Sequence, residues 1–109
     1  VQVETQASLD NLDEILGVEG VDACYIGPWD LSNNLGYSVP PKWDEPGYID
    51  AFDRVLEVCD EYGKPAGMFC NIDTIAWAIE KGFTYNTVSA ADDFLKHGAT
   101  IALERARGA

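Results

Sequence analysis

The sequence lacks the features that mark membrane and nucleic-acid-binding proteins. Its longest apolar runs, such as residues 76–79, are far shorter than the roughly 20 residues of a membrane-spanning helix. Only 7 Lys and Arg stand against 19 Asp and Glu, and the resulting net charge of -12 repels phosphate backbones and anionic lipid surfaces. We therefore expect a soluble protein that binds neither nucleic acid nor membranes.

Cysteine and histidine are also scarce. Cys24, Cys59 and Cys70 are odd in number and include no C-x-x-C pair, so the sequence indicates neither a disulfide framework nor a zinc knuckle. The cytoplasm is the compartment that we expect. The single histidine, His97, lies near a predicted helix end, where a capping or surface role is more common than catalysis.

Strand and helix patterns alternate along the whole chain. Short β-branched or aromatic runs predict strands, and segments with helical periodicity follow them, which is typical of a parallel sheet covered by helices. The predicted strands span residues 1–4, 22–27, 65–70 and 83–88, and the predicted helices 8–16, 48–62, 72–81 and 91–107, the last with a break at Gly98-Ala99. A long loop, residues 28–47, follows the second strand, and loops of that length are often functional.

Four βα units of this size correspond to half of a (β/α)8 barrel, which has about 250 residues. We therefore expect an α/β fold in which residues 1–109 form a partial barrel domain whose N-terminal half is missing. Half of a barrel leaves two open strand edges and uncovered side chains facing the lumen. We expect the chain to act together with more polypeptide.

Two carboxylates lie where barrel active sites are built, at the carboxyl ends of strands. Glu4 ends the first predicted strand, and Asp30 follows the second. Gln2 and Glu4 are two residues apart on a strand, so both side chains point to the lumen. A divalent cation with oxygen ligands would offset the cost of desolvating the carboxylates, although a helix-capping or surface role remains an alternative.

The residues around Asp30 strengthen this interpretation. Gly27-Pro28-Trp29-Asp30-Leu31-Ser32 sets a rigid turn, and its backbone N–H groups, close to a short helix start, could hold a substrate carboxylate. The remaining acidic residues fall mainly on polar helix faces, where a solvated exterior is the simpler explanation.

Over its whole length, the sequence resembles the C-terminal half of the class II pyruvate aldolases of the HpcH/HpaI type, the 4-hydroxy-2-oxoheptanedioate and 2-dehydro-3-deoxyglucarate aldolases. The residues that carry the resemblance are Gln2-Val3-Glu4-Thr5 and the Gly-Pro-x-Asp-Leu-Ser signature from Gly27 to Ser32. Further similar segments are Leu12-Asp13-Glu14-Ile15, Gly20-Val21-Asp22, Lys64-Pro65-Ala66-Gly67 and Lys81-Gly82-Phe83.

The resemblance implies a role for each matching residue. It implies that Glu4 and Asp30 bind a divalent metal (Mg2+, Mn2+ or Co2+), that Gln2 contacts pyruvate, and that the backbone around Trp29 and Asp30 receives the pyruvate carboxylate. The implied reaction is cleavage of a 4-hydroxy-2-oxo acid to pyruvate and an aldehyde, in a homo-oligomer, with a hexamer suggested. Two departures are Trp29, in place of a small residue, and Val88-Ser89-Ala90-Ala91, which lacks the glycine and aspartate of the family.

The resemblance places no catalytic acid or base in this half, because the histidine, aspartate and arginine that would move protons belong to the first half of the barrel. We therefore expect the segment alone to be inactive. Two alternatives stay open. One is a CoA-thioester lyase of the citrate lyase β-subunit or malyl-CoA lyase type, and the other is a non-catalytic half-barrel that pairs with another chain.

Overall fold

The computed structural model describes residues 1–108, which form a four-stranded parallel sheet with helices between the strands. The strands lie in the order β1-β2-β3-β4, so each one pairs with its neighbour in sequence. They span Gln2–Val3 (β1), Cys24–Ile26 (β2), Ala66–Phe69 (β3) and Tyr85–Thr87 (β4). The predicted series of four βα units is confirmed.

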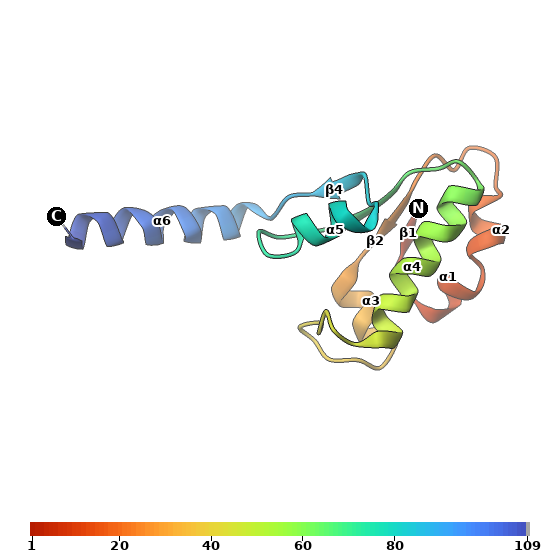
Figure 1. Ribbon diagram of the computed structural model, residues 1–109, viewed down its shortest axis with the longest axis horizontal. Coiled ribbons are helices and arrows are strands. Elements are labelled where there is room, and N and C mark those ends of the chain that lie inside the picture. Colours follow the sequence, from red (N-terminus) through yellow and green to blue (C-terminus); the bar gives the residue numbers. More distant parts are fainter. Residues whose placement is uncertain (109) are drawn as a thin grey trace.

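Six helices connect or follow these strands (Figure 1). They are α1 (Gln6–Asp10), α2 (Leu12–Leu16), α3 (Pro28–Asn34), α4 (Pro46–Glu61), α5 (Ile75–Lys81) and α6 (Ala91–Gly108). Among the helices of residues 1–108, none combines the length and the apolar character that crossing a bilayer requires.

The core lies between one face of the sheet and the helices, chiefly α4. Alternation along the strands directs Val3, Cys24, Ile26 and Met68 to this face, where all four are buried. On the opposite face Gln2 and Tyr85 are exposed, and Tyr25, Phe69 and Thr87 are half-buried. The sheet therefore has one covered and one open face, and in a closed barrel the open face lines the lumen.

An aromatic cluster anchors the segment that follows α3. Trp43 contacts Tyr48, Phe52 and Trp77, with ring centroids 5.6, 5.6 and 5.1 Å away. Phe52 also lies edge-on to Phe83, 6.0 Å away. Such pairs add about 0.5–1.5 kcal/mol each beyond the area that they bury, so this cluster holds the loop against α4 and α5.

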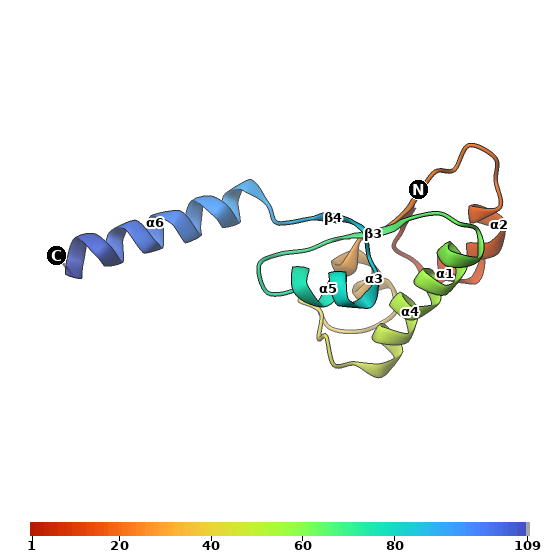
Figure 2. The same cartoon turned by 45° about the horizontal axis from the view of Figure 1, so that its top comes forward.

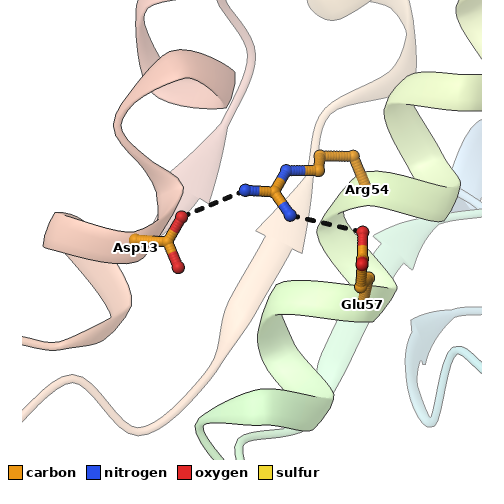
Figure 3. A network of polar contacts seen from close by, with 3 residues as sticks. All are labelled: Asp13, Arg54 and Glu57. Carbon is orange, nitrogen blue, oxygen red and sulfur yellow. Dashed lines mark hydrogen bonds and ion pairs between the residues drawn. The ribbon is translucent and has the colours of Figure 1, made fainter.

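A polar network links α2 to α4 at the surface. Arg54 on α4 donates to Asp13 on α2 at 3.0 Å and to Glu57, one turn further along α4, at 3.2 Å (Figure 3). Since the side chains of Arg54 and Asp13 are 44% and 55% exposed, water screens the pair and it adds little stability.

Helix α6 extends away from the rest of the chain (Figures 1 and 2). The described chain measures 58 × 29 × 21 Å, and every residue of α6 is exposed. Its large apolar side chains are Phe94, Leu95, Ile101 and Leu103, which are 56%, 73%, 39% and 53% exposed. None of these side chains contributes to the core of the described residues.

Two of the predicted helices begin or break at positions where polar side chains bond to the backbone. The predicted helix 8–16 is two short helices, because Asn11 lies between them and its side-chain amide donates to the Ala7 carbonyl at 2.7 Å. The predicted helix 72–81 starts only at Ile75, since Asn71 and Thr74 hydrogen-bond to each other and form a turn. The strands are also shorter than predicted.

Three further predictions were wrong. The segment predicted as a loop, residues 28–47, begins with helix α3, which Pro28 starts because its fixed φ suits the first helical position. Helix α6 is unbroken at Gly98-Ala99, since a single glycine costs only about 1 kcal/mol in a helix. His97 therefore lies within a helix rather than near its end, and its predicted surface location is confirmed.

The buried hydroxyl of Tyr48 connects α4 to the start of α3. It donates to the Pro28 carbonyl at 2.7 Å. In the full-length protein, Tyr48→Phe should lower the free energy of unfolding by about 0.5–1.5 kcal/mol, because it removes this buried hydrogen bond. Denaturant titration measures the change, with Tyr62→Phe at an exposed tyrosine as control. Equal effects of the two substitutions would contradict this account.

Candidate metal and substrate site

Glu4 follows β1 directly, and its side chain lies on the open face of the sheet. The Gln2 side-chain amide donates to Glu4 Oε1 at 2.6 Å. The sequence predicted that the side chains two residues apart would lie on one side, and this hydrogen bond confirms it. Gln2 thus holds the Glu4 carboxylate in one orientation.

Asp30 lies in the first turn of α3, which begins directly after β2. Because β1 and β2 are parallel neighbours, with Val3 beside Ile26, the ends of both strands meet and bring Asp30 to Glu4. The two carboxyl groups are within hydrogen-bonding reach, so a protonated Glu4 can donate to Asp30. Burial raises the pKa of Glu4 above its usual 4.5, and the charge and the hydrogen bond of Asp30 raise it further.

The absence of a side chain at Gly27 makes this arrangement possible. A Cβ atom at position 27 would lie 2.2 Å from Glu4 Oε1 and 2.9 Å from Glu4 Cδ. Real Cβ atoms do not approach so closely, so Gly27 lets the Glu4 side chain lie across the end of β2.

The two carboxylates share a pocket of about 310 Å³. Trp29 lies at its edge with 54% of its surface exposed. The other residues that line the pocket are Gln2, Tyr25, Gly27, Pro28 and Phe69. Sequence analysis did not identify Tyr25 or Phe69, although strand alternation places both on the same face as Glu4 and could have indicated them.

The first turn of α3 offers backbone donors beside the carboxylates. Pro28 has no N–H, and the first hydrogen bond of the helix runs from Leu31 N to Gly27 O at 3.0 Å. The N–H groups of Trp29 and Asp30 therefore have no partner within the helix. Such N–H groups, together with the positive end of the helix dipole, favour an anionic group of a ligand.

The carboxylate pair fits a hard divalent cation. The ion pairs found within residues 1–108 involve neither Glu4 nor Asp30. Within the same residues no cluster of three or more His, Cys, Asp or Glu side chains could hold a metal ion. The ligands that this pocket offers are therefore the two carboxylates of Glu4 and Asp30. Mg2+ is commonly held by one or two carboxylates, with water or substrate in the other positions.

The three cysteines and two of the lysines lie away from this pocket. Cys24, Cys59 and Cys70 are buried free thiols, in agreement with the sequence analysis. Lys64 donates to backbone carbonyls of the α2 end, among them Val18 O at 3.4 Å, and Lys81 pairs with Asp53 at 2.7 Å. None of these side chains lines the pocket.

A sequence model of the HpcH/HpaI aldolase/citrate lyase family matches residues 1–102. The chain belongs to this family. It is 37% identical over 92 residues to the hydroxypyruvate/pyruvate aldolase of Rhizorhabdus wittichii, a match that covers 84% of the chain and 36% of that protein. It is 68% identical over 67 residues to the 2-keto-3-deoxy-L-rhamnonate aldolase of Escherichia coli, covering 62% of the chain and 24% of that protein.

Solved structures share the fold of this chain. A family protein from Burkholderia cenocepacia superposes with a TM-score of 0.90 at 30% identity, over 98% of this chain and 41% of that one. Macrophomate synthase, at 20% identity, shares the fold with a TM-score of 0.80, over 98% of this chain and 37% of its own. The chain therefore has the predicted α/β half-barrel fold and spans less than half the length of these proteins.

Because the two carboxylates lie close together, a substitution of Asp30 should change the titration of Glu4. Asp30→Asn removes a like charge from beside Glu4 and should therefore lower the pKa of Glu4 from its raised value. Carboxyl-carbon NMR of the metal-free, full-length protein measures the titration. The control Asp22→Asn, at an exposed aspartate outside the pocket, should leave it unchanged. An unaltered Glu4 titration in Asp30→Asn would show that the pair does not interact.

Proposed function

We propose that the protein is a divalent-metal-dependent aldolase that cleaves 4-hydroxy-2-oxo acids to pyruvate and an aldehyde. The observation that carries the proposal is the Glu4–Asp30 pair, two adjacent carboxylates in one pocket that form no ion pair within residues 1–108. Membership of the family and the names of its aldolase relatives support the same reaction.

Glu4 and Asp30 would hold the metal, which we propose to be Mg2+, Mn2+ or Co2+. When bound, such an ion is a Lewis acid that stabilises negative charge on the keto oxygen of a 2-oxo acid. Gln2 keeps Glu4 oriented through its 2.6 Å hydrogen bond and lies close enough to contact the substrate. Hydrogen bonds of this kind fix metal ligands in their binding geometry.

The backbone at the start of α3 is the proposed site of the substrate carboxylate. The N–H groups of Trp29 and Asp30 have no partner within the helix and lie beside the carboxylate pair. They attract the carboxylate of pyruvate for the same reason that helix starts bind phosphate. The Trp29 ring, which is largely exposed, lies at the edge of this pocket and can cover a bound ligand.

The pocket supplies little for proton transfer. Among the described residues that line it, none is a histidine, lysine or arginine. Cleavage of a 4-hydroxy-2-oxo acid needs a base within hydrogen-bonding reach of the 4-hydroxyl group. We therefore propose that the catalytic acid and base come from further βα units, that this chain is one half of an aldolase domain, and that it is inactive alone.

A homo-oligomer is the quaternary state that we propose. Helix α6 supports it, because its apolar side chains are exposed along the whole helix and a second copy of the chain could cover them. Sedimentation of the full-length protein tests this proposal, and a monomeric mass would contradict it.

The alternative within the same family is a lyase of CoA thioesters. The family includes citrate lyases as well as aldolases, and both kinds of reaction act on carbon–carbon bonds beside a carbonyl group. The 68% identity to an aldolase over 67 residues favours the aldolase. Assays of the full-length protein on 4-hydroxy-2-oxo acids and on malyl-CoA, with Mg2+ or Mn2+, separate the two.

Exchange of the pyruvate methyl protons in D2O tests the proposed reaction. The full-length protein should catalyse this exchange only with a divalent metal, and Glu4→Gln or Asp30→Asn should slow it at least about 100-fold, since several kcal/mol of charge stabilisation are lost. The control Glu19→Gln, at an exposed glutamate, should retain the rate. Metal-dependent exchange that persists in Glu4→Gln would refute the proposed site.

A further inference from the structure

A hydroxyl pair on the open face of the sheet is not used by the proposed reaction. The Tyr25 hydroxyl on β2 lies 2.6 Å from Thr87 Oγ1 on β4, a hydrogen-bonding distance. Strand β3 lies between these two strands. The Tyr25 side chain therefore crosses β3 to reach its partner, and its ring lies over the middle of the sheet.

Gly67 lies on β3 between the two strands that carry these hydroxyl groups, and its lack of a side chain lets β4 approach β3 closely. In the strand register Gly67 lies between Tyr25 and Tyr85, and it contributes no side chain to the open face. A Cβ atom there would lie 1.7 Å from the Tyr85 carbonyl oxygen. The Tyr85 ring meets Tyr25 edge-on, with centroids 6.0 Å apart, so the Tyr25 ring is held both by a hydrogen bond and by an aromatic contact.

Tyr25 also separates two hollows on this face. Together with Gln2 it lines the pocket that contains Glu4 and Asp30, and the same two residues line a second hollow of about 530 Å³ beside Thr87. Each of the two separating residues is fixed by a hydrogen bond, Gln2 to Glu4 and Tyr25 to Thr87. The boundary between the hollows is thus a built feature of the sheet.

We propose that Tyr25, positioned by Thr87, closes the pocket beneath the Glu4–Asp30 pair and thereby selects 2-oxo acids with a small substituent at C3. This inference rests on the proposed function. The carboxylate and keto groups of the substrate belong beside the polar side of the pocket, at Asp30 and Glu4. The apolar C3 carbon is then left to the apolar part of the lining, which includes the rings of Tyr25 and Phe69.

The size of the expected effect follows from the cost of accommodating methylene groups. One methylene in an apolar pocket is worth about 10–200-fold in kcat/KM. Tyr25→Ala removes the ring and joins the two hollows, so it should raise the kcat/KM for C3-proton exchange of 2-oxopentanoate, relative to pyruvate, by at least about tenfold. Tyr25→Phe and Thr87→Val only release the ring, and each should raise the ratio by less.

The experiment uses the full-length protein with Mn2+ and follows exchange in D2O for both 2-oxo acids. The double variant Tyr25→Phe/Thr87→Val should change the ratio no more than either single variant, because all three remove the same hydrogen bond. Tyr85→Phe is the matched control, since its hydroxyl makes no hydrogen bond within residues 1–108. Mn2+ affinity, measured for each variant, reports whether the carboxylate pair is intact.

The outcomes distinguish a failure of the proposed role of Tyr25 from a failure of the proposed aldolase function. An unchanged ratio in Tyr25→Ala, with Mn2+ affinity retained, overturns the role of Tyr25 while the aldolase proposal stands. If Tyr25→Ala does not fold, unchanged ratios in Tyr25→Phe and Thr87→Val overturn it equally. A wild-type protein that exchanges neither 2-oxo acid refutes the proposed function itself.

Discussion

The site depends on the close approach of two like charges. Burial raises the pKa of Glu4, and Asp30 is near enough for its charge and its hydrogen bond to raise that pKa further. Two ionised carboxylates at such a distance repel each other unless a proton or a cation lies between them. Within residues 1–108 no ion pair reaches either group, so a divalent metal is the ligand that this arrangement favours.

Neighbouring parts of the fold keep the carboxylates in place against this repulsion. The parallel pairing of β1 with β2 aligns the two strand ends, and Gly27 leaves the space that the Glu4 side chain fills. Tyr48 connects the start of α3 to the core through Pro28, and Gln2 fixes the orientation of Glu4. The covered face of the sheet thus supports the open face that carries the carboxylate pair.

The sequence predicted the parts of the fold that arise from periodic burial. Strand alternation and helical periodicity identified four βα units, and they placed Gln2 and Glu4 on one face, because these patterns reflect which side chains meet the core. The approach of Asp30 to Glu4 followed from the rule that strand ends gather at one edge of a parallel sheet.

Other features depended on contacts that a periodic pattern does not contain. The break at Asn11 results from a side-chain hydrogen bond. Helix α3 lies in a segment that was predicted as a loop, because its glycine, proline and asparagine residues are typical of loops. The hydrogen bond between Tyr25 and Thr87 joins residues that are 62 positions apart. Its existence depends on the strand register, which only the folded structure reveals.

The chain covers 24–36% of the length of these two aldolase relatives, so the decisive measurement uses the full-length protein. Electron paramagnetic resonance of added Mn2+ counts bound metal directly and needs no substrate. The account predicts one Mn2+ per chain in the wild type and in Glu19→Gln, with the signal of bound metal lost in Glu4→Gln and in Asp30→Asn. Equal Mn2+ binding by all four proteins would contradict the central claim that these two carboxylates form a metal site.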